Sequence, residues 1–147
     1  MFTKTINGSM RITGGIILGG KAMGCIGEPS AITTAGNAAY SAANLLTGII
    51  SRDPNGDDRA DTLPTAAALV AAIPGAIVGT SFGFAVQNRS NAESGETITV
   101  TAPNGAVTVS GVATIALGKA RLFRVRLTNR AAGSEAYTAY SIGLMDV

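Results

Sequence analysis

The chain has 147 residues, of which 46% are hydrophobic and only 14% are charged, and its formal net charge is +2. This length predicts a single domain with a substantial core, and the small net charge argues against strong attraction to nucleic acid. The charged fraction is well below the usual level of about 25%. A free monomer would therefore expose much neutral surface, and we expect copies of the chain or a partner to cover part of it.

The composition also restricts the chemistry that the chain can perform. There is no histidine, so Ser-His-Asp and Cys-His catalysis are absent and a zinc site is not expected. Cys25 is the only cysteine, which excludes an intramolecular disulfide, and we interpret it as a small buried residue. No pattern in the sequence predicts a cofactor or a metal site, and we expect that the protein is not an enzyme.

The first part of the chain, residues 1–27, contains seven glycines. Ordering glycine costs backbone entropy, so we expect an N-terminal arm or edge element, with a short strand near residues 11–18, that gains order by packing on another surface. Within it, Gly15 to Lys21 match the first seven positions of a phosphate-binding loop, but Ala22 stands where a Ser or Thr should bind magnesium. We therefore expect no nucleotide site. Residues 28–147 are predicted to form a single β domain.

The next segment favours extended structure with a long loop. Threonine and isoleucine predict short strands at residues 31–34 and 44–51. Between them, residues 35–43 are small and polar and suit a turn or a single helical turn. Residues 51–61 contain proline, asparagine, glycine and four aspartates, and this composition predicts a solvated loop.

Residues 62–88 carry no charge and are long enough to span a bilayer. A Pro-Gly pair breaks the middle of this stretch and its second half alternates like a strand, so we expect no membrane span. Its first half predicts a short helix near residues 64–73, with Asp61 or Thr62 as the N-cap and the Pro-Gly pair as its end.

After Gly79 the hydrophobic period becomes two, which indicates strands. Turn residues separate these strands, and a Pro-Asn-Gly sequence at residues 103–105 predicts a hairpin. Short strands at roughly ten-residue spacing predict an all-β fold. We expect a jelly-roll-like sandwich or barrel of about eight short strands, one short helix near 64–73 and the Gly-rich arm. The strands predicted in this half cover residues 81–87, 96–102, 107–109, 113–117, 120–129 and 136–145.

One basic cluster stands out, formed by Lys119, Arg121, Arg124, Arg126 and Arg130. In a regular strand the last three lie on the same side, opposite Phe, Val and Leu side chains of the core face. No aromatic residue of this segment alternates onto the basic side, which argues against binding of single-stranded nucleic acid. Two interpretations stay open, namely a solvated strand face that discourages edge pairing and a surface for an acidic protein partner.

Several segments in the last two-thirds of the chain, taken in order, resemble head decoration, or cement, proteins of tailed bacteriophages. The resemblance extends over about residues 45–145 and is carried by the order of the segments, since no single motif among them is diagnostic. The segments are Asp61–Leu69, Val78–Phe82, Asn88, Gly95–Val100 and Phe123–Asn129.

The resemblance implies a jelly-roll-like domain on the outer surface of an icosahedral capsid, assembled as a homodimer or homotrimer. It would bind the major capsid protein and clamp neighbouring subunits against the pressure of packaged DNA, without a cofactor and without direct contact with nucleic acid or membrane. The alternative is a head-fibre or tail component that binds a host receptor. From surface chemistry we predict the following contacts with the capsid or between copies: Phe2, Lys4, Ile6, Arg11, Arg124, Arg126 and Arg130.

Overall fold

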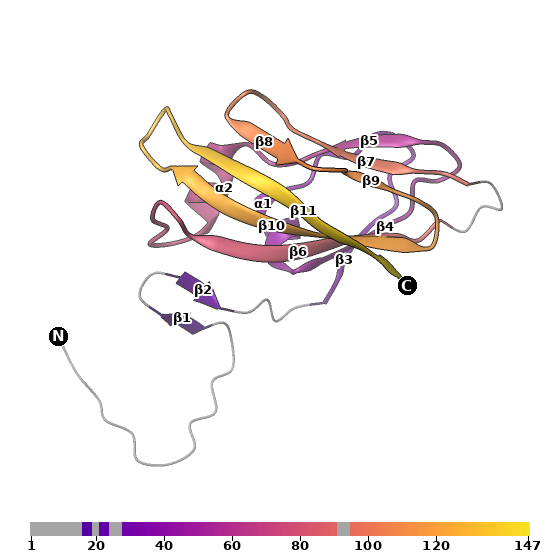
Figure 1. Cartoon of the computed structure of the whole chain (residues 1–147), viewed down its shortest axis with the longest axis horizontal. Helices are drawn as coiled ribbons and strands as arrows, with labels where there is room; N and C mark the ends of the chain where they lie inside the picture. The colour runs from indigo at the N-terminus through magenta and orange to yellow at the C-terminus, as the bar shows by residue number, and fades with distance from the viewer. Residues whose placement is uncertain (1–15, 19–20, 24–27, 91–94) are drawn as a thin grey trace, which may run out of the picture.

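The computed structural model describes residues 16–18, 21–23, 28–90 and 95–147, and these residues confirm an all-β sandwich (Figure 1). The elements are β1 (Ile16–Leu18), β2 (Lys21–Met23), β3 (Ser30–Ile32), α1 (Ala42–Leu46), β4 (Ile49–Arg52), β5 (Arg59–Thr62), α2 (Ala66–Ala72), β6 (Ser81–Asn88), β7 (Ile98–Thr101), β8 (Val107–Ser110), β9 (Thr114–Ile115), β10 (Lys119–Asn129) and β11 (Ala136–Asp146).

The sandwich has two unequal layers. The larger is a six-stranded sheet in the order β3-β4-β6-β10-β11-β8, and the smaller sheet has the order β5-β7-β9, with β1 and β2 paired to each other. In Figure 1 the long strands β6, β10 and β11 run side by side, with α2 toward one end of the fold, α1 near its middle and β5, β7 and β9 toward the other end. One core cluster joins Phe84 and Phe123 of the large sheet to Ile98 of the small sheet, Leu45 of α1 and Leu69 of α2. The small sheet and both helices therefore cover the same face of the large sheet.

The two central strands follow the predicted alternation. From Phe84 to Asn88 in β6 and from Arg121 to Leu127 in β10 every second side chain is buried, including Phe123 and Val125. The rings of Phe84 and Phe123 stack with their centroids 5.2 Å apart, which is the spacing that favours aromatic pairs. These two strands provide the apolar floor on which the second layer packs.

The predicted hairpin at residues 103–105 is wrong. The turn itself forms, since the Val107 amide donates to the Asn104 carbonyl over 3.2 Å, but β7 and β8 belong to different sheets. The turn passes the chain from the small sheet to the edge of the large one, where β8 pairs in parallel with β11. The pairs β3–β4, β4–β6 and β5–β7 are also parallel, so the topology is mixed, whereas a jelly roll is built from antiparallel strands.

A second helix replaces the first part of the strand predicted at 44–51. Helix α1 begins after Ser41, whose hydroxyl accepts from the Asn44 amide while the Asn44 side chain accepts from the Ser41 amide. This capping box satisfies two free amides of the first turn. Leu45 is fully buried in the core, so tertiary packing outweighs the weak local preference of this segment, and only Ile49–Arg52 forms the strand.

The uncharged stretch 62–88 divides as predicted into a helix and a strand. Helix α2 ends at Ala72, with Ile73 as its C-cap before the Pro-Gly pair, but its N-cap is Thr65, whose hydroxyl accepts from the Ala68 amide over 3.3 Å. The predicted caps, Asp61 and Thr62, lie instead in strand β5. Among the described residues, no helix is long and apolar enough to cross a membrane.

The predicted solvated loop at residues 51–61 is wrong at both ends, because Arg52 and Asp61 are fully buried. Arg52 Nε lies 2.7 Å from Asp61 Oδ2. The Asp61 carboxylate also accepts from the Tyr40 hydroxyl over 2.8 Å and from the Ala38 amide over 2.7 Å. Asp61 is thus the centre of a buried polar network, in a strand that the sequence did not predict.

The Arg52 guanidinium uses its remaining donors on backbone carbonyls. It donates to Thr34 over 2.9 Å and to Gly36 over 2.7 Å, and it also reaches the carbonyl of Asp53. Arg52 belongs to the large sheet and Asp61 to the small one. The ion pair therefore connects the two sheets and holds the connection between β3 and α1 against both.

We predict that Asp61→Asn lowers the free energy of unfolding by about 3–5 kcal/mol, because it leaves a buried guanidinium without its counter-charge. Urea unfolding followed by far-UV circular dichroism measures this change. The control is Asp57→Asn, which removes the pair between Arg59 and an Asp57 side chain that is 73% exposed; exposed pairs contribute about 1 kcal/mol or less. Equal losses in the two variants would contradict the role given to the buried pair.

Two buried tyrosines predict a loss of stability in alkali. Burial raises the pKa of Tyr40 and of Tyr137 well above the ordinary value, and for Tyr40 the Asp61 charge adds to the effect. The Tyr137 hydroxyl donates to the Pro64 carbonyl over 2.7 Å. Below the unfolded-state pKa of about 10, both states keep these protons and the stabilisation by the buried phenols is complete. Above that pH only the unfolded chain releases them, so the free energy of unfolding falls as pH rises.

The measurement is tyrosinate absorbance together with circular dichroism in a Tyr140→Phe background, which leaves only the two buried phenols. We expect absorbance to appear together with unfolding. Titration of both phenols near pH 10 in a chain that stays folded would contradict the burial assigned to them.

Candidate interaction surface

The face of the six-stranded sheet that points away from the core is exposed and mixed in chemistry. Alternation along β10 buries Phe123 and Val125 and exposes Leu122, Arg124 and Arg126. Strand register then places the outward residues of the neighbouring strands beside these. We call this surface the outer face, and it consists of Ile49 and Ser51 of β4, Ser81, Gly83, Ala85 and Gln87 of β6, Leu122, Arg124, Arg126 and Thr128 of β10, and Thr138, Tyr140 and Met145 of β11.

The two arginines are the only charged residues of the outer face. Arg124 lies between Gly83 and Tyr140 in the register, and its guanidinium donates to Ser81 Oγ over 3.0 Å. Among the described residues, neither Arg124 nor Arg126 forms an ion pair with a carboxylate. The outer face therefore carries two positive charges without a compensating negative one.

Large apolar side chains flank these charges. Leu122 is 36% exposed, Tyr140 38%, Ile49 39% and Met145 45%. Arginine, aromatic residues and methionine are the types enriched at protein–protein interfaces, where aspartate, glutamate and lysine are depleted. The segment of β10 alone predicts no aromatic residue on the basic side, and the neighbouring strand β11 adds one there, Tyr140.

The basic cluster predicted from the sequence separates into distinct environments. Arg121 faces the inside, where it donates to the Thr114 carbonyl over 3.1 Å and to Ser141 Oγ over 2.9 Å. Lys119 forms an ion pair with Asp146. Both cations are thus used within the molecule and are not part of the outer face.

Arg130, another predicted contact residue, is not on the outer face. Arg130 follows the end of β10, and its guanidinium donates to the Ala76 carbonyl over 3.1 Å, which directs it toward the segment after α2. Phe2, Lys4, Ile6 and Arg11 lie outside the described residues. Of the predicted positions that the structure describes, Arg124 and Arg126 lie together on one surface and Arg130 does not.

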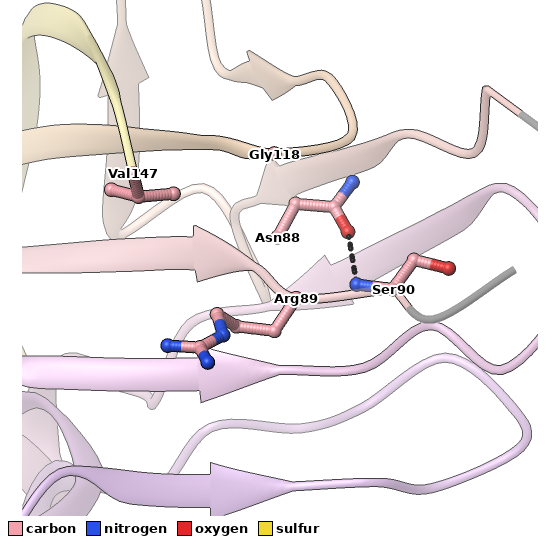
Figure 2. A pocket seen from close by; sticks show the side chains of 5 residues that line it. All are labelled: Asn88, Arg89, Ser90, Gly118 and Val147. Carbon is pink, nitrogen blue, oxygen red and sulfur yellow. Dashed lines mark hydrogen bonds between the residues drawn. The ribbon is translucent and has the colours of Figure 1, made fainter. Parts of the chain in front are cut away.

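A small pocket lies where β6 ends, lined by Asn88, Arg89, Ser90, Gly118 and Val147, with a volume of about 360 Å³ (Figure 2). Its central amide is used structurally: the side chain of Asn88 donates to the Glu96 and Ile115 carbonyls over 2.9 and 3.2 Å and accepts from the Ser90 amide over 3.2 Å. In Figure 2 the Arg89 guanidinium extends away from this amide. Ser90 supplies the hydroxyl of the lining, and this hydroxyl donates to the carboxylate of the buried Glu96.

Other chemical sites find no support in the described part of the chain. It contains no group of three or more His, Cys, Asp or Glu side chains that could hold a metal ion. The apparent phosphate-loop lysine, Lys21, begins strand β2, whereas a phosphate-binding loop leads into a helix whose first amides cradle the phosphates.

No protein-family model, no curated protein and no solved structure matches the chain. The function is therefore inferred from the surface chemistry and from the segments that resemble decoration proteins.

Proposed function

We propose that the chain is a structural virion protein, a decoration or cement protein that binds the outside of an icosahedral phage capsid. The observation that carries this proposal is the outer face, where two arginines that pair with no carboxylate of the described residues lie among large exposed apolar side chains. Such a combination is typical of surfaces that bind another protein. The low charge of the whole chain and the segments that resemble decoration proteins support the same function.

The fold suits this task because the outer face is rigid. Its central strand, β10, is paired along most of its length on both sides, with β6 and with β11. Side chains held on such a scaffold lose little further backbone entropy on binding, which increases the affinity obtained from a given contact area. A standard protein contact buries about 800 Å² on each partner, which the face of a six-stranded sheet can supply.

The proposed mechanism is mechanical and needs no chemical step. Each copy binds the assembled capsid and not its separated subunits, so binding stabilises the assembled state by mass action. Repetition over a symmetric shell multiplies a modest stabilisation per contact. The expected partners are the major capsid protein and further copies of this chain.

We predict that virions containing this protein carry hundreds of copies, release them on heating before the particles rupture, and rupture at a lower temperature when the protein is missing. Quantitative gels of purified particles, followed by thermal rupture assays on wild-type and deletion particles, measure all three. Absence of the protein from purified virions, or an unchanged rupture temperature, would contradict the proposal. About a dozen copies would instead indicate a head-fibre or tail component.

A further inference from the structure

We infer that the outer face binds an acidic protein surface and that Arg124 and Arg126 are its ionic anchors. This inference rests on the proposed function, since the partner is taken to be a capsid protein, and it goes further by naming the surface used and the chemistry that the partner must present.

The charge of the outer face is complementary to an acidic partner. The residues of the outer face include two guanidinium groups and no carboxylate. The nearby cation Lys119 is paired with Asp146 and Arg121 is hydrogen-bonded within the fold, so the uncompensated charge of the outer face lies on Arg124 and Arg126. Carboxylates are the groups that guanidinium binds in a bidentate, directional way.

The spacing of the anchors restricts the partner further. Arg124 and Arg126 are two positions apart on one strand, so their backbone positions are separated by about 7 Å. The partner must offer carboxylates at a similar spacing, as alternate residues of an extended segment do. Leu122 and Tyr140, exposed next to the anchors, require apolar groups on either side of these carboxylates.

The same charges argue against a second copy as the occupant of the outer face. A two-fold contact would place the same face on both copies and would bring four guanidinium groups together without a carboxylate among the face residues. Like charges opposed in an interface cost several kcal/mol. Copies of the chain are therefore expected to meet through other surfaces.

Nucleic acid is also a poor fit for the outer face. Affinity for nucleic acid depends on the number of phosphates that are neutralised, and this face offers two arginines and one exposed aromatic ring, Tyr140. Proteins that bind single strands combine a charged groove with several stacking rings. Two phosphate contacts would give weak binding that moderate salt abolishes.

The test is binding of purified chains to capsids of the encoding phage that lack this protein, measured by co-sedimentation across a salt series. We expect Arg124→Glu/Arg126→Glu to weaken binding at least about 100-fold, since it opposes acidic groups on the partner. The control is Arg89→Glu, which makes the same charge reversal at an exposed arginine that is not part of the outer face. Its affinity for capsids should stay within about twofold of wild type. Circular dichroism confirms folding, and Arg124→Gln/Arg126→Gln replaces the double variant if that variant does not fold.

The outcomes separate the two proposals. If the wild-type chain binds no capsid, the proposed function fails together with the inference. If the wild type binds and the double variant binds equally well, the outer-face inference is overturned while the proposed function stands. A double variant that binds capsids but loses its oligomeric state in light scattering would overturn the inference in favour of contact between copies. Tight, arginine-dependent binding of a single-stranded DNA oligonucleotide would overturn it in favour of nucleic acid.

Discussion

The buried ion pair between Arg52 and Asp61 is the interaction on which the arrangement of the two sheets depends. It joins β4 of the large sheet to β5 of the small one. A buried pair is tolerated only when its remaining donors and acceptors are also bonded, and the carbonyls of Thr34 and Gly36 and the hydroxyl of Tyr40 meet this requirement. Among the described residues, no buried side-chain nitrogen or oxygen lacks a partner. The apolar core supplies most of the burial, whereas this directional network specifies how the layers meet.

The buried inner face and the exposed outer face of the six-stranded sheet both follow from the alternation of side chains along β10. Along β10, Phe123 contributes to the core and Arg124 to the outer face. A shift of register by one residue would exchange the two sets, so the packing that stabilises the sandwich also holds the arginines outward. Within the described part of the chain, the small sheet and the helices cover the inner face and leave the outer face exposed to a partner.

The sequence predicts what is encoded locally and misses what depends on distant partners. The alternation of β6 and β10, and the helix that ends at the Pro-Gly pair, follow from neighbouring residues, and so does the shared face of Arg124 and Arg126. Arg52 and Asp61 stand in a segment whose composition favours solvent, and their burial depends on carbonyls and side chains many positions away. For the same reason the local turn signal between β7 and β8 does not reveal that these strands belong to different sheets. The place of Tyr140 beside Arg124 requires the β10–β11 register, which no local pattern specifies.

The most direct test of the account is a cryo-electron microscopy map of the particle that carries this protein. The account predicts that the outer face of β6, β10 and β11 lies against the capsid, with the guanidinium groups of Arg124 and Arg126 within hydrogen-bonding distance of capsid carboxylates. A map in which this face points to solvent, while the protein holds the capsid through another surface, would contradict it.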